Sequence, residues 1–245
     1  MNVRLQRGFT IVELILFLGI TGILFVSLMM GVNTSISTQQ YKESAVTVKT
    51  FLERQFTETM NPRNIRDDNW SCTQETGIIQ DAVNGVPRGT SRCVVLGRYI
   101  TVHGDGTRLR AGDVIGIEPS DTVGLAAGDM TVLRAYTPRL SPVGVEEVDV
   151  TWQSRLQTHD HGVSSASFII VRSPQSGIIR TFTTNATLPE NDLTPLFTKE
   201  HMDMSETLCV MPSSLVAVPT HSVRIDPRVG SVAGIVLNEN DEACY

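Results

Sequence analysis

A long apolar run dominates the beginning of this 245-residue chain. It extends from Phe9 to Val32, reads FTIVELILFLGITGILFVSLMMGV, and contains a single charged residue, Glu13. A helix of this length crosses the ~30 Å of hydrocarbon in a bilayer. The run therefore predicts a transmembrane helix and limits residues 33–245 to one side of a membrane.

Two cations precede the run and predict its orientation. Arg4 and Arg7 lie just before Phe9, and positively charged flanks stay on the cytoplasmic side. A secretory signal peptide fits poorly, because its apolar core is shorter and a small-residue cleavage site follows it. The residues that follow here are Asn33, Thr34, Ser35 and Ile36 instead. We expect a single-pass protein of the cytoplasmic membrane, with its N-terminus inside and its head outside.

Glu13 is the unusual residue of the run. A carboxylate in a membrane helix costs a few kcal/mol, so such residues usually have a partner. If the chain is cut between Gly8 and Phe9, the new amino group lies about one helical turn from Glu13. Glu13 could then neutralise its own terminus or that of an adjacent subunit. A carboxylate tolerated near the membrane interface is the alternative.

The segment from Arg7 to Ile15, RGFTIVELI, resembles the prepilin leader and mature start of the type IV pilin and type II secretion pseudopilin superfamily. The resemblance covers about the first fifth of the chain. It implies that a membrane-embedded prepilin peptidase removes residues 1–8 after Gly8 and methylates the amino group of Phe9. It also implies that Glu13 sets the axial register of subunits in a filament.

The apolar run lacks the proline that many pilins carry in this helix. Three glycines, Gly19, Gly22 and Gly31, are the alternative weak points. Glycine weakens a helix, and it also lets neighbouring helices approach closely. The sequence leaves local melting and tight packing equally open.

Residues 33–61 continue the helix as an amphipathic segment. Apolar residues recur at steps of mostly three or four, which is typical of one buried helix face. The stop is Asn61 followed by Pro62, since the residue before a proline avoids helical geometry. We expect one helix from Phe9 to about Met60, with two helices broken near residues 33–38 as the alternative. The expected stripe consists of Val32, Ile36, Tyr41, Ala45, Val48, Leu52, Phe56 and Met60.

Residues 62–245 predict a globular head rich in β-strands. Residues 62–92 read as a loop-rich connection, and short β-branched runs follow. Turn signals at residues 103–106 and 174–177 predict hairpins. The expected fold class is α+β and pilin-like, with the long helix packed on an antiparallel sheet. The candidate strands are 93–102, 108–117, 131–136, 145–152, 167–172 and 178–183, with weaker ones at 222–225 and 229–237.

All four cysteines follow the apolar run, and none has the C-x-x-C spacing of a zinc or redox site. An even number beyond a membrane span predicts disulfides. We expect Cys72 to pair with Cys93, and Cys209 with Cys244, because each bond would tether an irregular stretch. Four reduced, buried thiols are the alternative, since not every exported chain meets oxidising conditions.

Two clusters invite a metal interpretation. His159, Asp160 and His161 are good ligand types, but with Gly162 after them they predict a solvated turn. The acidic tail at residues 238–242 offers oxygen ligands of the kind calcium prefers, and some related pseudopilins bind calcium in this general region. Its spacing does not match an EF-hand loop. We expect an exposed acidic loop, no metal and no cofactor, with calcium as the alternative for the tail.

Motifs of catalysis and of nucleic-acid binding are missing from the sequence. It contains no nucleophile elbow, phosphate loop or H-E-x-x-H motif. The formal net charge is −6, and without a long Lys/Arg run the chain lacks the basic face that collects phosphates. We therefore expect neither an enzyme nor a nucleic-acid partner.

The resemblance implies a structural subunit of a type IV pilus or type II secretion-like filament. A minor pilin or a pseudopilin is one interpretation, and the sequence leaves open whether the subunit is a major or a minor one. Its implied partners are prepilin peptidase, other pilin or pseudopilin subunits, an assembly platform protein and, indirectly, an assembly ATPase. The sequence leaves open whether the filament serves adhesion, motility, DNA uptake or secretion. The rival hypothesis is a membrane-anchored exoplasmic enzyme, or a ligand-binding or adhesin domain, with a pilin-type N-terminus.

Overall fold

The computed structural model describes residues 10–63, 70–73, 77–80, 91–120, 128–159, 165–212 and 219–244. The chain divides into two compact units, Met1–Gln40 and Tyr41–Tyr245. Helix α1, Ile11–Met60, contributes to both. The expected single helix is thus confirmed, and the alternative of a break near residues 33–38 is wrong. The helix ends where expected, immediately before Asn61 and Pro62.

The packed stripe of α1 begins at Tyr41, later than expected. Val32 and Ile36 are about half exposed, and so is Met60 at the other end. The reason lies in residues 33–40, NTSISTQQ, which carry polar side chains on every face and give no continuous apolar stripe. The buried residues of α1 are Tyr41, Ser44, Ala45, Val48, Phe51, Leu52, Gln55, Phe56 and Thr59.

The larger sheet of the second unit has six antiparallel strands. Its order is β5-β4-β3-β8-β9, and β6 also pairs with β4. The predicted hairpins at residues 103–106 and 174–177 join β3 to β4 and β8 to β9. The strands are β3 (Cys93–His103), β4 (Arg108–Ile117), β5 (Arg139–Leu140), β6 (Glu146–Asp149), β8 (Ser167–Arg172) and β9 (Ile179–Thr184).

A second antiparallel sheet has four strands in the order β12-β11-β10-β7. A separate two-stranded ribbon, β1 with β2, lies within the stretch expected to be loop-rich. These strands are β7 (Arg155–Thr158), β10 (Glu206–Met211), β11 (His221–Ile225), β12 (Ile235–Glu239), β1 (Trp70–Thr73) and β2 (Gly77–Gln80). The α+β class is confirmed, with two main sheets rather than one.

Residues 131–136, expected as a strand, lie instead in helix α2, Asp129–Ala135, except for Tyr136, which is its C-cap. Its buried side chains are the adjacent Val132 and Leu133, rather than alternating ones. Asp129 lies in its first turn, where an acid is favourable, and Arg134 in its last. A second short helix, α3, spans Lys199–Asp203. The 3₁₀ turns are Thr151–Gln153, Thr194–Leu196, Val232–Gly234 and Glu242–Cys244.

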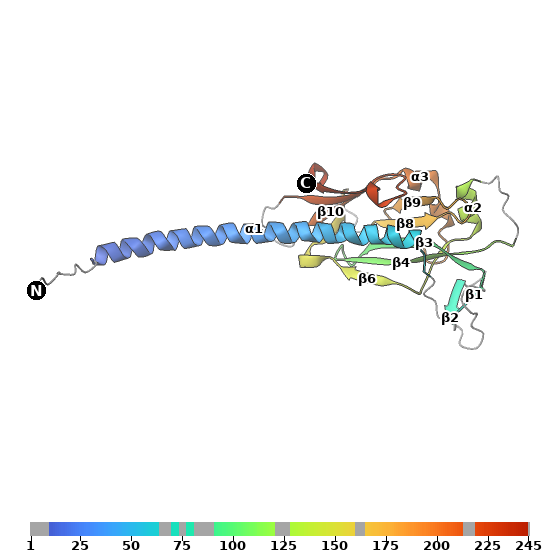
Figure 1. Ribbon diagram of the computed structural model, residues 1–245, viewed down its shortest axis with the longest axis horizontal. Helices are drawn as coiled ribbons and strands as arrows, with labels where there is room; N and C mark the ends of the chain where they lie inside the picture. Colours follow the sequence, from blue (N-terminus) through green and yellow to red (C-terminus); the bar gives the residue numbers. More distant parts are fainter. Residues whose placement is uncertain are drawn as a thin grey trace, which may run out of the picture. The chain divides into compact units, whose positions relative to one another are not determined.

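Two apolar cores lie on opposite faces of the six-stranded sheet. The first joins the buried stripe of α1 to that sheet, through side chains such as Ile100 and Phe168, and to the smaller sheet, through side chains such as Leu208. Figure 1 shows the second half of α1 running along β8, β3 and β4. The second core contains Leu133 of α2 and Phe182, whose ring stacks on Phe197. The Tyr41–Met60 part of α1 is therefore built into the head.

Candidate membrane and assembly helix

The two expected processing residues, Gly8 and Phe9, lie outside the described residues, which begin at Thr10. Cleavage between them and methylation of Phe9 stay predictions. Helix α1 begins at Ile11, two residues after Phe9 in the sequence.

Thr10 caps the start of α1. Its side-chain Oγ1 accepts a hydrogen bond from the backbone N–H of Glu13 at 3.3 Å, and its carbonyl accepts from Leu14 N at 3.1 Å. Glu13 thus occupies the third position of the helix. The spacing Thr-x-x-Glu is the sequence signature of a capping box, which our sequence reasoning missed. Glu13 also lies where the helix macrodipole favours a negative charge.

The first unit presents apolar side chains around its whole circumference. From Ile11 to Val32, the large apolar side chains are 51–77% exposed, and the most apolar stretch of α1 has no buried residue. A helix of 22 such residues is ~33 Å long, close to the thickness of the hydrocarbon layer. A helix that is hydrophobic all round requires a membrane or other helices around it. Among the described residues, α1 is the one helix long and apolar enough to cross a membrane.

Threonine hydroxyls along this helix donate hydrogen bonds to carbonyls of the preceding turn. Thr21 Oγ1 donates to the carbonyl of Phe17 at 2.8 Å, and Thr34 Oγ1 donates to Met30 at 3.0 Å. Polar groups paired in this way within one helix suit an environment without water.

Among the residues that the structure describes, the three glycines of the apolar run meet no packing partner. A Cβ added at Gly19, Gly22 or Gly31 would find no atom within 4 Å outside its own helical turn. Contacts with the described part of the chain therefore do not require glycine at these positions. A neighbouring helix that approaches closely would require it.

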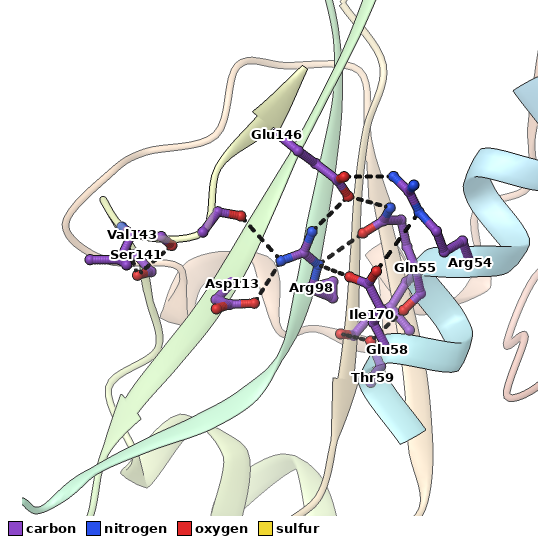
Figure 2. A network of polar contacts seen from close by, with 11 residues as sticks. Arg54, Gln55, Glu58, Thr59, Arg98, Asp113, Ser141, Val143, Glu146 and Ile170 are labelled. Carbon is purple, nitrogen blue, oxygen red and sulfur yellow. Dashed lines mark hydrogen bonds and ion pairs between the residues drawn. The ribbon is translucent and has the colours of Figure 1, made fainter. Parts of the chain in front are cut away.

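In the second unit, a buried ion-pair cluster holds α1 against the sheet (Figure 2). Arg98 of β3 donates to Asp113 of β4 at 2.7 Å and to Glu146 of β6 at 2.9 Å. On the helix side, Arg98 Nε lies 2.8 Å from Gln55 Oε1 and 3.2 Å from Glu58 Oε2. One guanidinium thus joins α1 to three strands.

Glu146 is the second link in this Arg98 cluster. It accepts hydrogen bonds from Gln55 Nε2 at 2.8 Å and from Arg54 Nη2 at 2.6 Å. The Asp113 and Arg98 side chains are 10% and 7% exposed, so this pair is the buried centre of the cluster. Burial raises the pKa of the Asp113 carboxyl above its ordinary value, whereas the hydrogen bond from Arg98 opposes that rise.

Cys209 and Cys244 form a disulfide, with Cα atoms 5.5 Å apart. The bond ties the last 3₁₀ turn to β10 and closes a loop over β11 and β12. Cys93 is also disulfide-bonded, so the alternative of four reduced thiols is wrong. The side chain of Cys72 lies outside the described part of the chain, and its pairing with Cys93 stays a prediction.

The two clusters considered for metals are engaged with protein groups where they are described. Nδ1 of His159 lies 2.7 Å from the carbonyl oxygen of Ala243, while Asp160 and His161 lie outside the described residues. In the acidic tail, Asp241 accepts hydrogen bonds from Ser222, from Asn238 and from the backbone of Ala243. These bonds, that from Ser222 above all, lower the pKa of Asp241. Within the described residues, no group of three or more metal-ligating side chains converges.

Glu239 of the same tail forms an ion pair with Lys42 of α1 at 2.5 Å. Both side chains are about half exposed. This contact, like the Arg98 cluster, joins α1 to the head, although an exposed pair contributes little to stability.

Comparison with protein-family models, with curated proteins and with solved structures finds no match to this chain.

Proposed function

We propose that this chain is a structural subunit of a type IV pilus or type II secretion-like filament, made as a precursor and cut between Gly8 and Phe9. The observation that carries the proposal is the exposed apolar part of α1, from Ile11 to Val32, with one carboxylate, Glu13, in its first turn. The chain is held in the cytoplasmic membrane by this helix before assembly. In the filament, the corresponding helices of other subunits replace the lipid.

The capping geometry supports a role for the charge of Glu13. The helix begins at Ile11, so a chain cut before Phe9 would have its new amino group two residues before the first helical residue. The macrodipole disfavours a cation at this end of a helix and favours the carboxylate. An amine beside Glu13, from the same or a neighbouring subunit, removes the cost of burying either charge alone. Pairing between subunits would fix their axial register.

The head supports the proposal through its attachment to α1. Because the Arg98 cluster and the apolar core seat the segment from Tyr41 onward in the head, a force on the helix is carried into the folded domain. Prepilin peptidase, other pilin or pseudopilin subunits and an assembly platform are the proposed partners. The energy for assembly would come from a separate ATPase, and the chain itself would catalyse no reaction.

The test compares two substitutions at Glu13 that separate charge from capping. Glu13→Gln removes the charge but keeps a side chain that can complete a capping box, whereas Glu13→Ala removes both. Each variant is expressed with the wild-type filament machinery, and its amount is measured in the membrane fraction and in sheared filaments.

We expect both variants to reach the membrane at wild-type levels and to be depleted from filaments to a similar extent. Normal incorporation of Glu13→Gln together with loss of Glu13→Ala would reassign Glu13 to helix capping. Normal incorporation of both variants would refute the proposed role of Glu13 in setting the axial register. Recovery of the wild-type chain solely as membrane monomers would refute filament membership and favour an anchored exoplasmic domain.

A further inference from the structure

A polar cavity of about 440 Å³ lies on the face of the six-stranded sheet opposite α1. Side chains alternate across a strand. Ile100 and Leu109 pack in the core with α1. Tyr99 and Thr101 of β3 and Arg110 of β4 therefore face the other way, and they line the cavity.

Two wall segments, residues 139–142 and 187–191, line the cavity, and backbone hydrogen bonds fix the first of them to the second and to β4. Leu140 N donates to the carbonyl of Glu190 at 3.1 Å, and Ser141 N donates to the carbonyl of Asp113 at 2.8 Å. Such bonds position the walls before any ligand arrives, which lowers the ordering cost of binding.

The floor of the cavity depends on a glycine. A Cβ at Gly112, the residue opposite Tyr99 in the sheet, would lie 2.6 Å from the Tyr99 ring. Gly112 thus lets the ring lie against the strand. Burial raises the pKa of the Tyr99 phenol, with Arg110 and Arg98 opposing the rise. The floor therefore presents a protonated hydroxyl, able to donate or accept a hydrogen bond.

The cavity is locally cationic in an acidic protein. Two arginines, Arg110 and Arg139, line it together with His103, and Glu190 is the single acid among the lining residues. The chain as a whole carries a formal net charge of −6. Arginine presents a planar fork of N–H donors that matches carboxylate and phosphate oxygens.

Arg110 differs from the arginine of the buried cluster in how it is paired. Its Nε lies 3.8 Å from Glu147, and both of these side chains are about half exposed. Another partner is the neutral Tyr99 phenol, whereas Arg98 contacts the carboxylate of Asp113 at 2.7 Å in a buried site. A long, solvated pair is weak. A ligand oxyanion can therefore compete for the Arg110 guanidinium.

We propose that this cavity, the Arg110 cavity, binds a small anionic ligand whose carboxylate or phosphate group is held by Arg110 and Arg139. The hydroxyls of Thr101 and Thr187 and the amide of Asn191 provide hydrogen bonds for a polar ligand body, as an acidic sugar would have. The proposal is independent of the filament role, because it uses neither α1 nor the N-terminal residues.

The test titrates the full chain, purified in detergent, with three probes by isothermal titration calorimetry. Glucuronate carries a carboxylate on a sugar ring, glucose is its neutral counterpart, and inorganic phosphate is the anion without a sugar. We expect glucuronate or phosphate to bind at millimolar concentrations or tighter, and glucose to bind at least about tenfold more weakly. A preference for glucuronate assigns the site to acidic sugars, and a preference for phosphate assigns it to phosphorylated ligands.

Matched variants locate the binding. Arg110→Gln should weaken anion binding by about tenfold or more. Arg108→Gln is the control, because Arg108 lies on the same strand, is equally exposed and also contacts Glu147, yet does not line the cavity. Glu190→Gln removes the one acidic wall residue and should tighten anion binding.

Three results would overturn the proposal. They are equal binding of glucose and glucuronate, no binding of either anion at millimolar concentrations, and equal losses for the Arg108 and Arg110 variants. Circular dichroism of each variant, compared with that of the wild type, verifies that the head is folded.

Discussion

Nη1 of Arg98 lies 2.7 Å from Oδ1 of Asp113, and the two residues face each other across β3 and β4. The pair is buried between the sheet and the C-terminal turns of α1, where Gln55 and Glu58 also contact Arg98. Taking charges out of water is costly, so a buried pair is stable only with good geometry and further hydrogen bonds. Both conditions hold here. The attachment of α1 to the sheet should therefore be sensitive to single substitutions in this cluster.

Arg98→Met should destabilise the head strongly. It leaves Asp113 buried without its cation, and removal of one partner from a buried pair costs about 3–5 kcal/mol. Arg108→Met is the matched control, because Arg108 forms exposed pairs on the neighbouring strand and should cost less than about 1 kcal/mol. Denaturant unfolding of the full chain in detergent measures both. Equal losses of unfolding free energy in the two variants would contradict a larger contribution of the buried cluster to stability.

Asp113 should make stability depend on pH in the acid range. Because burial raises its pKa above the ordinary value of 3.8, the folded chain holds this proton more tightly than the unfolded chain does. Between the ordinary and the raised pKa, the contribution of Asp113 to stability therefore falls as pH rises. Asp113→Asn removes this contribution, so the free energy of unfolding of the variant relative to wild type should rise with pH across that window. A difference independent of pH would contradict the raised pKa.

Loss of the bond between Cys209 and Cys244 should destabilise the smaller sheet. The two residues are 35 positions apart, and a loop of that size corresponds to about 3–4 kcal/mol in the chain-entropy model. The double substitution to serine should lower the free energy of unfolding by up to that amount. Unchanged unfolding of the serine variant would mean that the C-terminal turn is held by its hydrogen bonds alone.

Gly22 separates the two interpretations of the glycines in the apolar run. Gly22→Ala strengthens the helix but stays small, whereas Gly22→Leu fills the space that a neighbouring helix would use. If close packing requires glycine, Leu should reduce incorporation into filaments much more than Ala does. If local melting requires it, Ala should already impair assembly. The amount of each variant in sheared filaments, divided by its amount in the membrane fraction, measures its incorporation.

Helices and strands that are marked by a pattern of neighbouring residues could be predicted from the sequence. The apolar run and its continuation to Met60 gave one helix, and β-branched runs around clear turns gave β3, β4 and β8 almost to the residue. Prediction failed at α2, where Thr131 and Val132 favour a strand but the helix buries two adjacent residues. It also missed β7 and β10, whose pairing joins residues about 50 positions apart.

The Arg98 cluster was missed because its members are scattered along the chain and each resembles an ordinary surface charge. One sequence signal could have indicated part of this cluster. With the hairpin turn at residues 103–106, strand register places Arg98 directly opposite Asp113, and opposite charges at facing positions favour pairing. The contacts that α1 makes with this pair depend on the tertiary packing of the helix, which a local sequence pattern does not indicate. The Thr10 cap was readable from the Thr-x-x-Glu spacing alone.

The most direct test of the account is the intact mass of this chain recovered from sheared filaments. We predict a chain that begins at Phe9, carries one added methyl group and retains the whole apolar helix. A chain that still begins at Met1, one that has lost the apolar run, or its absence from filaments would contradict the proposed function.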